Sequence, residues 1–440
     1  MKAAIARTVA ELLTSPRVRD ARRAAFALRR RARGGTAVVS YFHQVDDPYS
    51  HLMLQVLPAF SARYGIELQP HLVLPPGDTV APDRPRLLEW SRRDAADLAA
   101  AVGLEFLDPN RQPDPALTSL ADRALAALFS NPHVSESTFT DALAVSDALW
   151  RGDRSRIERL AAAPEAEARH MLEAGTRLRK KLGHYLGATL NFEGEWYWSV
   201  DRLACLEQRL REAGLARDSR TDPLVTIPVV ECRHRPTNGH RPALHFFCSL
   251  RSPYTYVAVP RVRRLAEHYG AELHLRFVLP MVMRGLPVPR EKRLYILRDT
   301  KREAERLGLP FGRIVDPVGV PTERGLAVLH HAVGAGKGPQ FLESFMRGVW
   351  AEGIDAGSDD GLQQIAGQAG LDGAFVNAAL ADPSWREVAA ANREEMLALG
   401  LWGVPSFRVD DAAARWGQDR LWRVERDLIS ATQAAPTGAA

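Results

Sequence analysis

The sequence predicts an α/β protein of two tandem domains, each with an inserted all-helical subdomain. Two observations lead to this prediction. Apolar strand-like runs alternate with long stretches of helical periodicity, which is the pattern of α/β folds. The same order of runs occurs twice in the 440 residues, and equivalent residues such as Pro48 and Pro253 lie 205 positions apart. Two diverged copies of one domain are the simplest account of such a repeat.

The repeat is visible in single residues as well as in the order of elements. Ten residues of the first copy recur at the constant offset: Phe42, Pro48, Tyr49, Tyr64, Gly65, Glu67, Leu68, Val73, Leu74 and Pro75 match Phe247, Pro253, Tyr254, Tyr269, Gly270, Glu272, Leu273, Val278, Leu279 and Pro280. Further on, Trp198–Leu203 is echoed by Trp416–Leu421, where the offset has drifted to 218. The drift indicates small insertions between the copies.

Each copy has the same order of elements, which is a thioredoxin-like α/β pattern. A strand leads into a helix that begins at Pro48 or Pro253, and a second strand follows. A long helical stretch, a short strand and a final helix complete the copy. The four predicted strands are Thr36–Phe42, Ile66–Leu74, Ala243–Cys248 and Glu272–Val278.

These signals give the predicted domain boundaries. The first 35 residues form a basic amphipathic helix, which either packs on the body or touches a membrane surface. The linker contains one further strand candidate, Leu224–Val230. The predicted segments are the helix at 1–35, the degenerate first domain at 36–210, the linker at 211–242, the second domain at 243–430 and a flexible tail at 431–440.

Composition narrows the classes of function. Apolar residues make up 46% and charged residues 25%, as in soluble globular proteins. No apolar run approaches the roughly 18 residues of a membrane span. The net charge of +5 is concentrated in the first 33 residues, which argues against a nucleic-acid surface on the body. Three cysteines without CxxC or metal-ligand spacing predict a cytoplasmic protein with no disulfide framework and no metal.

Ser252 occupies the junction between the first strand and first helix of the second copy. Serine at the N-cap followed by Pro253 is ordinary capping, and Asp47 before Pro48 caps equally well. The functional interpretation is that the hydroxyl lies at a positive helix end and favours the thiolate of a bound thiol. No cysteine stands at this position, so the thiol would come from a cofactor.

The segment Leu401–Val409 predicts a loop followed by a strand that Pro405 begins, because proline cannot donate to a strand ladder. A cis bond between Val404 and Pro405 would turn the Val404 backbone toward whatever lies opposite. Trp402 would form a wall of the resulting cleft. After the strand, the residues from Gln418 open the final helix.

Three motifs in this order resemble those of the DsbA-like thioredoxin superfamily. The resemblance is closest to 2-hydroxychromene-2-carboxylate isomerase and kappa-class glutathione transferase. The motifs are Ser252–Tyr256, Gly403–Phe407 and Trp416–Leu421. The resemblance covers 243–430, and residues 36–210 resemble the same fold more weakly. It implies an enzyme that binds glutathione and acts on a conjugated small molecule, and Arg251, Arg284 and Arg420 suggest that this molecule is an anion.

The resemblance also implies a role for each matching residue. Ser252 would be catalytic and activate the glutathione sulfur. The remaining predicted site residues are Val404, Pro405, Gln418, Asp419 and Arg420 for the cofactor, and Tyr254, Arg284 and Trp402 for the substrate. Related enzymes pair as dimers, which predicts an intramolecular pseudo-dimer of the two copies and leaves a homo-oligomer open. A solution mass well above 48.7 kDa would count against a self-contained monomer.

The sequence departs from the family at two places. No asparagine follows Pro280, where the family carries one near its active site, although Arg284 brings a charge. The first copy has Asp47 in place of serine and no proline in Gly187–Leu190, so we do not expect it to bind glutathione. Two other functions remain open: a non-catalytic binding or scaffold protein, and a DsbA-type thiol–disulfide oxidoreductase, which the missing CxxC disfavours.

Overall fold

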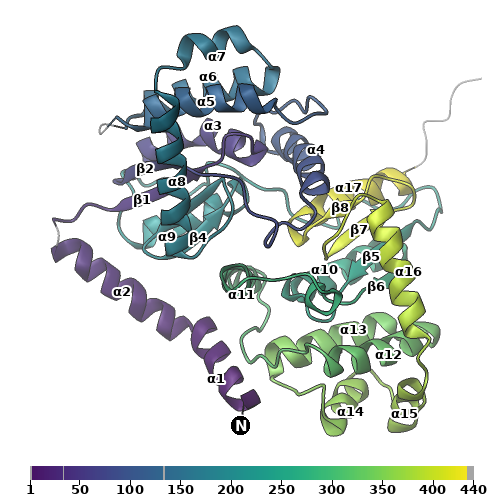
Figure 1. Ribbon diagram of the computed structural model, residues 1–440. Coiled ribbons are helices and arrows are strands. Elements are labelled where there is room, and N and C mark those ends of the chain that lie inside the picture. Colours follow the sequence, from purple (N-terminus) through teal and green to yellow (C-terminus); the bar gives the residue numbers. More distant parts are fainter. Residues whose placement is uncertain (1, 33, 132–133, 434–440) are drawn as a thin grey trace, which may run out of the picture. The chain divides into compact units, whose positions relative to one another are not determined.

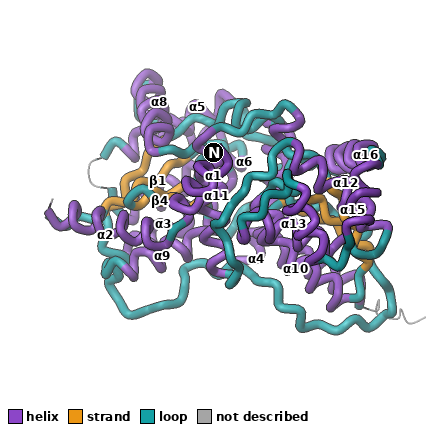
Figure 2. Tube along the Cα trace, turned by 90° about the horizontal axis from the view of Figure 1, so that it is seen from below, coloured by secondary structure: helices purple, strands orange, loops and turns teal. Residues whose placement is uncertain are grey.

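The structure is a computed structural model that describes residues 2–32, 34–131 and 134–433. The chain divides into two compact units. We call Asp20–Pro228 the first unit, and Met1–Arg19 with Val229–Ala440 the second unit. Each unit has a four-stranded sheet with helices around it (Figure 2). No helix within the described ranges is long and apolar enough to cross a membrane.

In the first unit the strand order is β2-β1-β3-β4. Figure 1 labels β1, β2 and β4 of this sheet. β1 runs parallel to β2 and antiparallel to β3, which is antiparallel to β4. The strands are β1 (Val38–His43), β2 (Glu67–Leu72), β3 (Thr189–Phe192) and β4 (Glu195–Trp198). The helices are α3 (Pro48–Arg63), α4 (Arg84–Val102), α5 (Pro115–Phe129), α6 (Glu136–Arg151), α7 (Arg154–Leu160), α8 (Glu165–Leu182) and α9 (Leu203–Glu212). Five of these helices, α4 to α8, are inserted between β2 and β3.

The second unit repeats this arrangement with the order β6-β5-β7-β8. Six helices, α11 to α16, are inserted between β6 and β7. The strands are β5 (Ala243–Cys248), β6 (Glu272–Phe277), β7 (Ser406–Val409) and β8 (Arg415–Trp416). The helices are α10 (Pro253–Tyr269), α11 (Arg290–Arg306), α12 (Val320–Gly334), α13 (Gly338–Arg347), α14 (Asp359–Gln368), α15 (Gly373–Ala381), α16 (Trp385–Ala398) and α17 (Leu421–Thr432). Short turns at Met281–Arg284 and Gln418–Arg420 precede α11 and α17.

The two sheets share strand directions and register. Val38 pairs with Glu67 in the first sheet and Ala243 with Glu272 in the second, so both partners are shifted by 205 positions. Two tyrosine–carboxylate hydrogen bonds of the first unit have equivalents in the second. They join Tyr49 to Asp94 and Tyr64 to Glu207 in the first unit, and Tyr254 to Asp299 and Tyr269 to Glu425 in the second. These contacts follow the offsets of 205 and 218 found in the sequence.

The N-terminal prediction needs correction. The described part of residues 1–35 forms two helices, α1 (Lys2–Thr14) and α2 (Pro16–Ala32), instead of one. Pro16 has no N–H for the helical ladder, so the first helix ends before it and the second can start on it. The basic residues of α2 include Arg23, whose guanidinium pairs with Glu195 of β4 at 2.7 Å.

The linker and tail also differ from expectation. Leu224–Val230 contains no strand. Its backbone is held in part by a side chain, because the Leu224 N–H donates to Glu207 at 3.0 Å. The last helix continues to Thr432, inside the predicted tail, and residues 434–440 lie outside the described part of the chain.

Candidate functional site

Three segments of the second unit meet at one edge of its sheet. β5 and β6 run parallel and end at Cys248 and Phe277, and the Val278 N–H bonds the Cys248 carbonyl at 2.9 Å. β7 starts at this edge, with Ser406 opposite Phe247. The loop before α10, the turn after β6 and the loop before β7 therefore converge. We call this place the β5 edge; it comprises residues 249–252, 279–284 and 402–405.

Ser252 is the N-cap residue of α10, as the sequence predicted. Its Oγ accepts the Thr255 N–H at 3.2 Å, and Pro253 occupies the first helical turn. The side chain is partly exposed, and accepting that bond leaves the hydroxyl hydrogen available. Ser252 can therefore donate to a ligand atom at the helix N-terminus, where the peptide dipoles favour negative charge.

The loop before β7 presents the backbone of Val404. The Val404–Pro405 peptide bond is cis. The Pro405 carbonyl accepts the Gly417 N–H at 2.9 Å, whereas Val404 makes no backbone hydrogen bond with the described residues. An extended peptide can pair with such unused N–H and C=O groups as an added strand does.

Trp402 lies two residues before Val404 and is almost fully buried. Its ring packs edge-on against Trp416, with centroids 5.1 Å apart. The buried indole Nε1 has no hydrogen-bond partner within the described ranges. The Lys292 ammonium lies 5.5 Å from the Trp402 centroid, within cation–π range. Burial lowers the pKa of Lys292 to about 8. Sequence reasoning missed Lys292, because one lysine in the charged helix α11 carries no distinguishing pattern.

The residues predicted to bind the cofactor at the last helix are unequally accessible. Gln418 and Arg420 are 1% and 3% exposed, whereas Asp419 is half-buried. Gln418 Nε2 donates to Asp419 at 2.5 Å and to Glu303 at 3.1 Å. Gln418 is therefore placed to orient Asp419. Of the three, Asp419 has the most surface for a ligand.

Two other polar groups near Ser252 are engaged by carboxylates of the second unit. The Tyr254 hydroxyl donates to Asp299 of α11 at 2.8 Å. Arg251 donates twice to Asp316, at 2.7 Å each. These bonds fix α11 and the loop after it to the start of α10. Because its hydroxyl is bonded to Asp299, Tyr254 could contact a substrate only through its aromatic ring.

The equivalent edge of the first unit is filled by its own side chains. Asp47 caps α3 by accepting the Ser50 N–H at 3.0 Å and its hydroxyl at 2.8 Å. The Ser50 Oγ accepts the Ala188 N–H at 3.0 Å. A Cβ on Gly187 would lie 2.5 Å from the Gln44 side chain. A ligand backbone therefore has little room beside Gly187, and an ionised Asp47 would repel a thiolate.

Two carboxyl groups make the first unit less stable as the pH rises. Burial raises the pKa of Asp47 to about 7, and burial together with nearby Asp46 raises the pKa of Asp122 to about 7. In the unfolded chain an aspartate has a pKa of about 3.9. The folded state therefore holds these protons more tightly. The resulting stabilisation is complete below about pH 4 and is lost as the pH rises through about 7.

We expect Asp122→Asn to flatten this pH dependence. The wild-type first unit should unfold at a lower temperature at about pH 8 than at about pH 5, and the variant should show a smaller difference. Thermal unfolding at both pH values measures the effect. Asp141→Asn, on an exposed position of α6, is the matched control. Equal pH slopes for wild type and Asp122→Asn would contradict the prediction.

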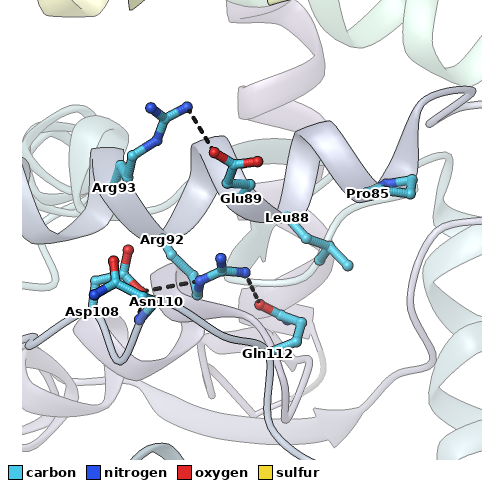
Figure 3. A pocket seen from close by; sticks show the side chains of 8 residues that line it. All are labelled: Pro85, Leu88, Glu89, Arg92, Arg93, Asp108, Asn110 and Gln112. Carbon is cyan, nitrogen blue, oxygen red and sulfur yellow. Dashed lines mark hydrogen bonds and ion pairs between the residues drawn. The ribbon is translucent and has the colours of Figure 1, made fainter. Parts of the chain in front are cut away.

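A pocket of about 540 Å³ lies in the first unit between α4 and the loop after it (Figure 3). Within it, buried Arg92 donates to Asp108 at 3.0 Å and to Gln112 at 2.8 Å. Arg93 pairs with Glu89 at 3.6 Å. The charged side chains that line the pocket thus pair with one another. It is lined by Pro85, Leu88, Glu89, Arg92, Arg93, Asp108, Asn110 and Gln112, none of which the sequence singled out.

Neither a metal nor a cysteine marks the β5 edge. The described residues contain no group of three or more histidine, cysteine or acidic side chains that could hold a metal. Cys248, the last residue of β5, is fully buried. Burial raises the pKa of its thiol far above the usual value. A thiol in that state is a poor nucleophile, because the thiolate is the reactive form.

Residues 243–428 match the family model of the DSBA-like thioredoxin domain. They form a domain of that family. The DSBA-like domain thus includes all three segments of the β5 edge and the start of α17. The family model recognises this one domain and does not extend to the first unit.

Three solved structures that are similar to part of the chain are as follows. A probable DsbA oxidoreductase from Streptomyces coelicolor is 23% identical, with 46% of this chain and 94% of that chain covered and a TM-score of 0.36. A 2-hydroxychromene-2-carboxylate isomerase is 21% identical, covering 42% and 94%, with a TM-score of 0.36. The cytosolic disulfide reductase DsbM from Pseudomonas aeruginosa with GSH is 21% identical, covering 43% and 96%, with a TM-score of 0.33. No curated protein matches the chain.

Proposed function

We propose that the DSBA-like domain is a glutathione-dependent isomerase or transferase with its active site at the β5 edge. One observation carries the proposal: Ser252 at a helix N-terminus and the unpaired Val404 backbone share an edge that has no cysteine of its own. The edge offers a hydroxyl donor and a positive helix end to a thiolate. A peptide that brings its own thiol supplies the missing sulfur.

The residues at the edge fit glutathione at three points. Ser252 would hold the sulfur, the Val404 backbone the cysteinyl unit, and Asp419 the ammonium of the γ-glutamyl end. Gln418 would orient Asp419 through their 2.5 Å hydrogen bond. Buried Arg420 and cis Pro405 would hold the neighbouring residues Asp419 and Val404 in place. When bound, glutathione supplies a thiolate that can add to a conjugated substrate and leave again.

The chain's own residues would prepare that chemistry. The Ser252 hydroxyl donates to the sulfur, which favours the thiolate over the thiol. Lys292 adds positive charge next to Trp402, which would wall the substrate side. Arg284 would attract an anionic substrate, since neither Arg251 nor buried Arg420 is available for that purpose. The substrate is thus a small, conjugated organic anion.

We further infer that residues 36–210 are a degenerate copy of the same domain. The shared strand order, the register shifted by 205 positions and the repeated tyrosine–carboxylate bonds support this inference. The filled edge around Asp47 indicates that this copy has no glutathione site. The two copies would form an intramolecular pseudo-dimer in a cytoplasmic protein, and the solution mass tests that arrangement.

A non-catalytic binding protein is the second candidate function. The burial of Gln418 and Arg420 and the missing asparagine after Pro280 favour it, because both reduce the contacts available to glutathione. A thiol–disulfide oxidoreductase is a weaker candidate. Its chemistry needs an accessible cysteine pair, and Ser252 stands where the first cysteine would be.

Calorimetric titration of glutathione into the full-length protein tests the proposal. We expect one saturable site per chain. Asp419→Asn should weaken binding about 10- to 100-fold, since a charged hydrogen bond contributes about 1.5–3 kcal/mol. Asp411→Asn, in the exposed turn between β7 and β8, is the matched control. If wild type does not bind glutathione, the proposal fails and the binding-protein alternative gains support.

A further inference from the structure

Two arginines from different elements lie near the end of β6, and the positive charge of Arg393 acts on Arg284. Arg284 ends the short turn that follows Pro280. Arg393 lies on α16, next to Asn392, whose side-chain amide donates to the carbonyl of Phe277, the last residue of β6, at 3.1 Å. The sequence separates the two arginines by more than a hundred positions. Only Arg284 of the two could therefore be predicted from the sequence.

Neither guanidinium has a partner in the described part of the chain. The Nε atoms of Arg284 and Arg393 are both buried and lack any hydrogen bond there. Nearby arginines behave differently. Arg276 and Arg408 both approach Glu395 of α16, at 3.5 and 3.6 Å, so the carboxylate two residues after Arg393 is already shared.

Two neighbouring arginines, each with a buried and unpaired Nε, are electrostatically unfavourable. Burial lowers the pKa of Arg284, and the nearby positive charge of Arg393 lowers it further. The Arg284 side chain still carries its charge at neutral pH, because the pKa of arginine starts above 12. Buried charges are ordinarily paired. A bound oxyanion would supply the missing acceptors and offset the repulsion between the two guanidiniums.

The loop before β7 carries another unused donor. The indole Nε1 of Trp402, on the loop before β7, is also buried without a partner in the described ranges. Two side chains of the β5 edge, Arg284 and Trp402, thus carry an unused N–H group, and Arg393 of α16 carries a third. The acidic residues near Ser252 do not compensate, since Asp316 and Asp299 are bonded to Arg251 and Tyr254.

We propose that Arg284 and Arg393 together bind a doubly charged oxyanion group of the small-molecule substrate. Two guanidinium groups match a phosphate monoester or a pair of neighbouring carboxylates, which share this chemistry. That the ligand is a substrate rests on the function proposed above; that the arginine pair binds an oxyanion does not. Arg393 then becomes a specificity-determining residue that selects dianionic over monoanionic substrates.

The test is calorimetric titration of the full-length protein with inorganic phosphate, with malonate and with acetate. Wild type should bind phosphate or malonate at least tenfold more tightly than acetate. Tighter binding of phosphate would indicate a phosphate monoester as the ligand group, and tighter binding of malonate a pair of carboxylates. Arg284→Gln and Arg393→Gln should each weaken that binding tenfold or more. Arg393→Lys, which keeps the charge and loses the planar fork, should bind with intermediate affinity.

Arg386→Gln is the matched control, because Arg386 also lies on α16 but is exposed and paired with Glu323 at 3.0 Å. It should bind the anions as wild type does. Without an anion, Arg393→Gln should unfold at the wild-type temperature or above it, since one of two repelling charges is gone. Phosphate or malonate should then raise the unfolding temperature of wild type and not of Arg393→Gln.

Several results would overturn the oxyanion site. The proposal fails if wild type binds phosphate, malonate and acetate with equal affinity. It also fails if Arg393→Gln binds these anions as tightly as wild type, or if Arg386→Gln weakens their binding as much as Arg393→Gln does. Titration with glutathione separates this proposal from the proposed function. If Arg393→Gln loses as much affinity for glutathione as it loses for phosphate or malonate, the arginine pair binds the cofactor, and its assignment to the substrate fails. If wild type binds phosphate or malonate but not glutathione, the oxyanion site stands and the proposed function falls.

Discussion

Replacing Gly403 by alanine should destabilise the second unit and abolish glutathione binding. A Cβ on residue 403 would lie 2.2 Å from Cζ2 of Trp416 and 2.6 Å from its Cε2. Atoms cannot approach so closely, so either the indole ring or the loop that carries Val404 must move. The ring has little freedom, since it packs against Trp402 at 5.1 Å. We expect the free energy of unfolding to fall by about 1–3 kcal/mol.

Chemical denaturation measures the loss of stability, and calorimetry measures the loss of glutathione binding. Gly367→Ala in α14 is the matched control, because a Cβ there would meet nothing within 4 Å. Alanine at that helical position should stabilise by up to about 1 kcal/mol. On a Trp416→Ala background, the cost of Gly403→Ala should largely disappear. An equal cost on both backgrounds would show that the clash is not its cause.

The backbone of the β5 edge could be predicted because its signals are local. The strand predicted at Ala243–Cys248 has those bounds, and α10 begins at Pro253 behind its Ser252 cap. Alternating apolar residues, a capping side chain and a proline act on the next few residues of the chain. The repeat helped further, since the helix predicted at Pro48 in the first unit also begins there.

The side-chain environment of the site could not be predicted in the same way. Gln418 is buried because Glu303, from a helix more than a hundred residues earlier, accepts its amide N–H. Arg251 faces a carboxylate 65 residues later, so it is not available to a ligand. Such partners are chosen by the packing of helices against the sheet. Sequence spacing does not encode which face of α11 meets the last helix.

The two site residues that were not predicted from the sequence depend on tertiary contacts in the same way. Lys292 and Arg393 became candidates because of what lies next to them: the Trp402 ring for the lysine, and an unpaired Arg284 for the arginine. Neither residue belongs to a motif in this sequence. A charged residue on a helix reads as a solvated surface position until the structure shows that its nitrogen is buried. Specificity at this edge is therefore set by tertiary contacts, and the motifs describe only its backbone frame.

Ser252→Ala should raise the pKa of the bound glutathione thiol by about 1–2 units. A hydrogen bond to a charged group contributes about 1.5–3 kcal/mol, and one pKa unit corresponds to about 1.4 kcal/mol. Affinity for glutathione should change less, since Val404 and Asp419 would keep their contacts. The ultraviolet absorbance of the bound thiolate, followed against pH, measures the shift. Turnover near neutral pH should fall with the thiolate fraction.

Loss of a helix cap must be separated from loss of the sulfur contact. Ser358 caps α14 in the same way, with its Oγ accepting the Gly361 N–H at 3.1 Å, so Ser358→Ala should cost a similar amount of stability, about 1 kcal/mol. It should leave the thiol pKa unchanged. Ser252→Thr keeps the hydroxyl and should keep most of the thiolate. If Ser252→Ala lowers stability as Ser358→Ala does and leaves the thiol pKa of bound glutathione at its wild-type value, Ser252 is a structural cap, and the N-terminus of α10 alone activates the sulfur.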